Sequence, residues 1–155
     1  METKLSITLQ IVTVIIVSVG IFLGFLNIGM KNYTKGLKQF TILGFIPLAL
    51  IAGIRHIFFP GDILAGQSKF FEFEAGGANL AVAVAAILAL SMKMDNKTLG
   101  VIYVTYAVYL LVSCIAWALF IGDGSKKYIM LGMHVCIIAI LLYFAYIAFN
   151  HGEDE

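Results

Sequence analysis

The sequence has few charged residues. Asp, Glu, Lys and Arg make up 12% of its 155 residues, against about a quarter in soluble domains. Apolar residues make up 61%, which leaves too few polar side chains to coat a water-soluble monomer. The net charge is only +1 and no basic block occurs, so a disordered chain and a nucleic-acid binder are excluded too. The class of protein that remains is a polytopic membrane protein in a lipid bilayer.

Long apolar runs carry the fold prediction. A helix needs about 20 mostly apolar residues to cross a bilayer, and its backbone amides must be satisfied internally. We therefore predict an all-α fold, a polytopic transmembrane helical bundle of five spans (a four-helix core plus one) in a single domain over residues 1–155. This predicts a multi-pass integral membrane protein. The expected spans are Leu5–Met30, Phe40–Phe59, Ala75–Met94, Leu99–Ile121 and Tyr128–Phe149.

The orientation depends on the lysines. Five spans place the two termini on opposite sides of the membrane, and we name the amino-terminal side side A and the other side B. Lysines are almost equally divided between the sides. Lys31, Lys35 and Lys38 directly follow the first span, and this favours side B as the cytoplasmic side.

Polar residues within the predicted spans gather towards side A. Ionisable residues inside membrane helices are rare and usually functional. The pattern predicts a pocket that opens to side A beneath a loop over Pro60–Phe73, lined by polar residues with Arg55 as a counter-charge. The predicted ligand-pocket residues are Arg55, His56, Glu72, Glu74, Asn79 and His134.

The third span can be divided into faces at about 100° per residue. Glu72 and Asn79 share one face, whereas Glu74 lies on a roughly opposite stripe of small residues that includes Gly77 and Ala81. Small residues let helices approach closely, within one chain or in a homo-oligomer. Glu74 is predicted either to pair with Arg55 or to contact a ligand. Asn79 is predicted to form a helix–helix hydrogen bond or to act in the site.

A redox site is an alternative. His56 and His134 lie at similar depth on different spans, as the ligands of a metal or a bis-histidine haem would. Tyr103, Tyr106 and Tyr109 are spaced three apart, which favours core packing and would also suit stacking on a quinone. No CxxC or HExxH spacing supports a metal site, so the leading hypothesis requires no cofactor.

Two motifs resemble a known family. Phe71–Leu80 is similar to the F-Q-F-E-x-x-x-A-N-L signature of an uncharacterised prokaryotic family of small integral membrane proteins, distantly DoxX-like in helical layout. Arg55–Ala65 is similar to that family's G-H-x-F-x-x-x-x-x-A stretch. Arg55 replaces the family's usual glycine, and Glu72 its glutamine. The resemblance implies a helical bundle of a prokaryotic plasma membrane with His56, Glu74 and Asn79 at its polar centre, and it implies no particular activity.

Three functions follow as hypotheses. The first is a membrane protein that binds or transports a small-molecule ligand in the side-A pocket. The second is a redox protein that uses haem, metal or quinone. The third is an accessory subunit of a larger membrane complex. The sequence does not decide whether the protein is an enzyme.

Overall fold

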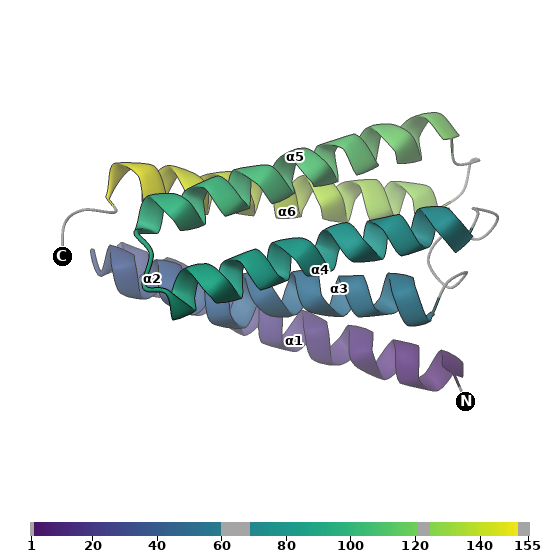
Figure 1. Cartoon of the computed structure of the whole chain (residues 1–155), viewed down its shortest axis with the longest axis horizontal. Coiled ribbons are helices and arrows are strands. Elements are labelled where there is room, and N and C mark those ends of the chain that lie inside the picture. Colours follow the sequence, from purple (N-terminus) through teal and green to yellow (C-terminus); the bar gives the residue numbers. More distant parts are fainter. Residues whose placement is uncertain (1, 60–68, 121–124, 152–155) are drawn as a thin grey trace. The chain divides into compact units, whose positions relative to one another are not determined.

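The structure, a computed structural model, describes residues 2–59, 69–120 and 125–151. Every regular element within these ranges is a helix (Figure 1), which confirms the all-α prediction. Part of the loop expected over Pro60–Phe73 lies outside the described residues, since α4 begins at Lys69. The elements are α1 (Glu2–Gly29), α2 (Tyr33–Gln39), the π-helix η1 (Phe40–Phe45), α3 (Ile46–Phe58), α4 (Lys69–Ser91), α5 (Asn96–Phe120) and α6 (Ser125–Asn150).

Five helical stretches are long and apolar enough to cross a membrane. The second is continuous through α2, η1 and α3. This indicates a multi-pass integral membrane protein, as the composition predicts. The stretches are Ile7–Gly29, Tyr33–Phe58, Glu72–Ser91, Asn96–Ala116 and Tyr128–Asn150.

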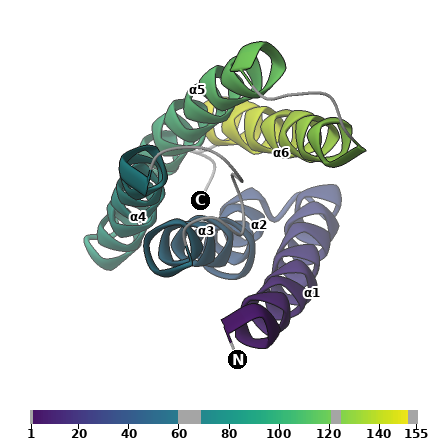
Figure 2. The same cartoon turned by 90° about the vertical axis from the view of Figure 1, so that its right-hand side faces the viewer.

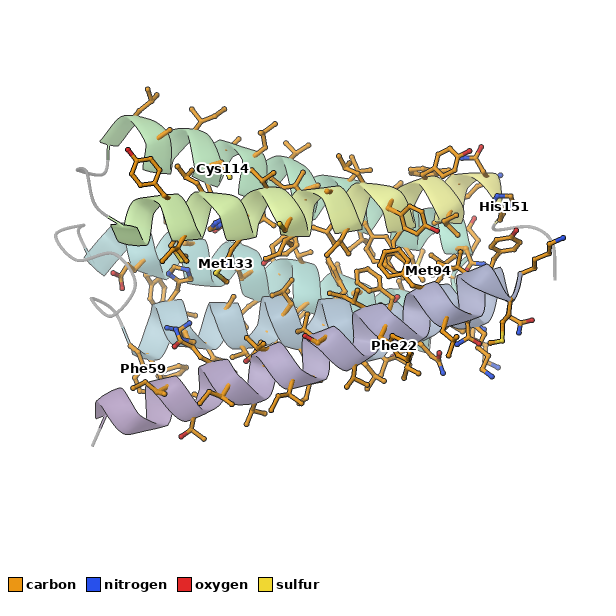
Figure 3. The ribbon with its side chains drawn as sticks, turned by 180° about the vertical axis from the view of Figure 1, so that it is seen from behind. Phe22, Phe59, Met94, Cys114, Met133 and His151 are labelled. Carbon is orange, nitrogen blue, oxygen red and sulfur yellow. The ribbon has the colours of Figure 1, made fainter. Side chains whose placement is uncertain are left out.

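Large apolar side chains are exposed along these helices. Phe22 of α1 (labelled in Figure 3), Val112 of α5 and Ile129 of α6 are exposed over 64%, 60% and 61% of their surfaces. In water such continuous apolar exposure would cause aggregation. Lipid tails are as apolar as leucine, so these faces suit contact with the bilayer.

Two helices begin earlier than the sequence predicts. The second span starts at Tyr33 instead of Phe40, and α4 starts at Lys69 instead of Ala75. Both added segments carry charged residues, which hydropathy counts as a break. A lysine can extend its long side chain from a helix end towards the headgroups, so Lys35 and Lys38 do not interrupt the second span, and Glu72 at the start of α4 is buried inside unit 1.

The described residues divide into two compact units, unit 1 (Met1–Met94) and unit 2 (Asp95–Glu155). In unit 1 the α2–η1–α3 helix packs against α1 on one side and α4 on the other (Figure 2). The start of α1, the end of α3 and the start of α4 therefore lie at one end of unit 1. The end of α1, the start of α2 and the end of α4 lie at the opposite end.

The π-helix η1 lies where α1 meets the second span. The backbone N–H of Ile46 donates to the carbonyl of Thr41, five residues earlier, and Pro47 follows in the first turn of α3. Proline has no N–H and its ring clashes with the carbonyl four residues before it, so a wider turn accommodates it. In this segment a Cβ at Gly20 of α1 would meet the backbone nitrogen of Gly44. The two helices thus touch through their backbones.

Helices α1 and α4 end in the same way. Lys31 and Lys93 have positive φ angles of 62° and 52°. Around each, the backbone bonds of a Schellman motif form: Asn32 donates to Asn27, and Met94 to Ala89, both at 2.9 Å. Glycine is the usual residue at such positions, because a left-handed conformation costs other residues about 1–2 kcal/mol.

Unit 2 is a hairpin of α5 and α6. A Cβ at Gly100 would lie 3.1 Å from the Phe149 ring and 3.2 Å from the Ala148 Cβ, so the helices pack closely there. Asp95 caps α5: its Oδ1 accepts from the Thr98 backbone N–H at 2.8 Å and from the Thr98 hydroxyl at 2.6 Å. These hydrogen bonds lower the pKa of Asp95 below its ordinary value of 3.8.

Candidate functional site

The buried face of α4 carries two polar side chains. Glu72 is 1% exposed and Asn79 is 3% exposed, and Ala83 on the same face is fully buried. Glu74, Gly77 and Ala81 are exposed. The prediction that Glu72 and Asn79 share a face that excludes Glu74 is confirmed. The carboxylate inside unit 1 is therefore that of Glu72.

A close approach of α3 and α4 brings His56 beside this face. A Cβ at Gly53 would lie 3.0 Å from the Gly76 carbonyl oxygen, and a Cβ at Gly76 would lie 3.2 Å from the Cβ of His56. Gly76 lies on the face of α4 that carries Glu72 and Asn79. The two glycines thus let the last turns of α3 press against the polar part of α4.

The first part of the small-residue stripe predicted to support close packing, Gly77 and Ala81, is on the exposed face of α4, whereas Ala89 further along the stripe is buried. A Cβ at Gly77 would meet no atom within 4 Å. Helical spacing shows which residues share a face, but it does not show which face packs. Here the buried face is the one that combines Gly76 with the polar side chains.

Arg55 links α3 to α1. With its oxygen turned towards the guanidinium, the Gln10 side-chain amide accepts hydrogen bonds from Nη1 at 2.8 Å and Nη2 at 2.6 Å. This orientation suits both the oxygen and the nitrogen of the Gln10 amide. Arg55 is half-buried and Gln10 is exposed. Gln10 was not among the predicted pocket residues, although its depth in the first span was the signal that could have found it.

Asn79 bonds along its own helix. Its Nδ2 donates to the carbonyl of Ala75 at 2.7 Å, which fixes the side chain against the buried face of α4. We call Gln10, Arg55, His56, Glu72 and Asn79 the polar end of unit 1. This set offers a guanidinium, an imidazole, a carboxylate and two amides within one end of three packed helices.

His134 belongs to unit 2 and is half-buried on α6. Its Nδ1 lies 2.7 Å from the carbonyl oxygen of Met130. A carbonyl only accepts, so Nδ1 carries the proton in this contact and a neutral ring presents Nε2 as its acceptor. The alternative with His56 and His134 as haem or metal ligands stays a prediction. Within the described residues, no group of three or more His, Cys, Asp or Glu side chains is placed to hold a metal ion.

The tyrosine stripe belongs to the packing of α5. Tyr103 and Tyr106 are buried at 0% and 2% exposure. The rings of Tyr106 and Tyr109 stack with centroids 5.9 Å apart and planes 12° from parallel. This arrangement supports the prediction that the stripe packs in the core.

Comparison of the chain with family models, with curated proteins and with solved structures finds no match. The resemblance of Phe71–Leu80 to the DoxX-like family of small membrane proteins therefore stays a prediction. The functional argument depends on the geometry of unit 1.

Proposed function

We propose that the polar end of unit 1 is a membrane-embedded site that binds a small polar ligand, and that the protein binds or transports this ligand. The observation that carries the proposal is the burial of Glu72, at 1% exposure, in a helix apolar enough to span a membrane. An ionisable side chain at such a place is costly and typically marks a ligand or ion pathway.

The side chains of the polar end define the ligand's chemistry. The Glu72 carboxylate accepts hydrogen bonds, the Arg55 guanidinium only donates them, and His56 and Asn79 can do either. A ligand that carries a cationic or hydrogen-bond-donating group together with an acceptor would satisfy this set. A small zwitterion or a hydroxylated molecule fits this description better than a purely apolar one.

The side chains of the site differ in burial, and this difference predicts the order in which an incoming ligand would contact them. Arg55 and its partner Gln10 are more exposed than Glu72. We expect an incoming ligand to meet the guanidinium first and the carboxylate last. The Gln10 amide holds the guanidinium through both terminal nitrogens, so Arg55 is already oriented before a ligand arrives.

The test uses two glutamates two positions apart on α4. Wild type, Glu72→Gln and Glu74→Gln are purified in mild detergent, and their small molecules are extracted and identified by mass spectrometry. We expect a small polar molecule in stoichiometric amount with wild type and with Glu74→Gln, and at least tenfold less with Glu72→Gln. Equal contents in all three samples would overturn the proposal.

A visible spectrum of the same samples addresses the redox alternative. The proposed site predicts no Soret band. A band that is present in wild type and lost in His56→Ala would favour haem binding over a small polar ligand. Melting temperatures of the variants show whether any loss comes from unfolding instead of from the site.

A further inference from the structure

The end of unit 1 opposite the polar end exposes four lysines. Lys31 follows α1, Lys35 and Lys38 lie on α2, and Lys93 follows α4; all four side chains are exposed. We call them the lysine end.

Glu72 and Glu74 are the carboxylates of unit 1 whose side chains the structure describes, and both lie near the start of α4, away from the lysine end. Asp95, the next acidic residue along the chain after Lys93, accepts two hydrogen bonds from Thr98 at the start of α5. Among the described side chains of unit 1, no carboxylate lies at the lysine end, and Asp95, two residues after Lys93, is held by Thr98.

Two of these lysines occupy positions that favour glycine. Lys31 and Lys93 have φ angles of 62° and 52°, and each ends a membrane-spanning helix through a Schellman motif. Their exposed side chains contribute little to packing. Glycine would make the same turn with less strain, so what lysine adds at both places is a charge.

The position of both lysines suits the lipid headgroups. Each lies two residues beyond a candidate span, which ends at Gly29 for α1 and at Ser91 for α4. Exposed methionines adjoin them: Met30 is 55% exposed, and Met92 and Met94 are 69% and 48% exposed. Met94 is labelled in Figure 3. A lysine lays its apolar stem along apolar surface and keeps its charge in a polar environment. A lysine next to an exposed methionine therefore suits the boundary between lipid tails and headgroups.

We infer that the lysine end binds the headgroups of anionic lipids. The shared chemistry is a phosphate anion, and the adjoining exposed methionines favour a lipid over free phosphate. A polybasic segment next to a membrane span is attracted to an anionic leaflet by its charge, and salt weakens this attraction. Glycine in place of Lys31 and Lys93 should weaken binding while it relieves the turn, so stability and lipid binding should change in opposite directions.

The experiment measures lipid retention by native mass spectrometry after exchange into detergent with equal phosphatidylglycerol and phosphatidylcholine. Wild type should retain phosphatidylglycerol preferentially. In Lys31→Gln/Lys93→Gln the preference for phosphatidylglycerol over phosphatidylcholine should fall about fivefold for each lysine replaced. The same fall is expected in Lys31→Gly/Lys93→Gly. Lys31→Arg/Lys93→Arg should keep it. The matched control is Lys4→Gln/Lys69→Gln, which removes the same charge near the starts of α1 and α4 and should keep the preference.

Three results would overturn the inference. One is equal retention of both lipids by wild type. Another is an equal loss in the control and in Lys31→Gln/Lys93→Gln, because the effect would then be one of net charge. The third is displacement of phosphatidylglycerol by millimolar inorganic phosphate at constant ionic strength, because the site would then be one for free phosphate. Melting temperatures of all variants show that each is folded.

Discussion

The two ends of unit 1 use charge in opposite ways. At the polar end the carboxylate of Glu72, the first residue of a candidate span, is 1% exposed, whereas at the lysine end Lys31 and Lys93 are exposed and lie two residues beyond candidate spans. A charge inside the bilayer is costly and needs partners, while a charge at the headgroups is nearly free. The burial of a charged residue is thus what separates the proposed ligand site from the proposed lipid contact.

The packing beneath the polar end gives the largest predicted effect. A Cβ at Gly76 would lie 2.5 Å from the Ile57 side chain and 3.0 Å from the Gly53 carbonyl oxygen. Gly76→Ala should therefore push α3 from α4 and cost about 3 kcal/mol. Gly77→Ala is the matched control, since its Cβ meets nothing and alanine favours a helix by up to about 1 kcal/mol. Unfolding in mixed micelles measures both, and a Gly76→Ala variant as stable as Gly77→Ala would refute this packing.

Truncation of the two α4 glutamates should separate a buried charge from an exposed one. Glu72→Ala removes a fully buried side chain and should cost about 2 kcal/mol. Glu74→Ala changes an exposed side chain and should stay within about 0.5 kcal/mol of wild type. The same unfolding titration compares them. Similar losses for both variants would show that burial does not distinguish these two positions.

Unit 1 should become more stable when Lys31 or Lys93 of the lysine end is replaced by glycine. Lys31→Gly and Lys93→Gly relieve left-handed residues at φ 62° and 52° and should each stabilise unit 1 by about 1 kcal/mol. Lys35→Gly, in the middle of α2, is the control and should instead destabilise by about 1 kcal/mol. A loss of stability in Lys31→Gly would mean that the lysine side chain supports the fold.

The smallest effect concerns a carboxylate outside the membrane spans. Hydrogen bonds from Thr98 lower the pKa of Asp95 in the folded state, so its stabilising effect on α5 is complete above the unfolded value of about 3.8. It is lost as the pH falls below that value and through the folded pKa. Asp95→Asn should keep the cap and lose this pH dependence, while Asp95→Ala should lose both. Circular dichroism at pH 7 and at about pH 2 is the measurement. An unchanged acid response in Asp95→Asn would contradict the role of this carboxylate.

Hydropathy was sufficient to predict the five helices and their approximate positions, because the cost of unsatisfied backbone in lipid leaves few alternatives. It placed the starts of α2 and α4 too late, because it treats a lysine or glutamate as an interruption, although a lysine side chain can extend to the headgroups and Glu72 is buried inside unit 1. The π-helix before Pro47 was missed for another reason: it depends on local backbone geometry, which side-chain hydropathy does not describe.

The candidate site was predictable in part. Helical spacing correctly grouped Glu72 with Asn79 and separated Glu74, since the 100° rotation is fixed by the helix itself. Which face would be buried depended on the partner helix, and the contact of Gly53 with Gly76 decides it. The partnership of Arg55 with Gln10 joins residues on different helices, so periodicity within one helix could not reveal it.

The most direct measurement compares both ends in one set of samples. Native mass spectrometry of wild type, Glu72→Gln and Lys31→Gln/Lys93→Gln would record the bound small molecule and the bound anionic lipid together. The account predicts a crossed result: Glu72→Gln loses the small molecule and keeps the lipid, and the lysine variant does the reverse. Loss of both by either variant, or of neither by both, would contradict the separation of the two ends.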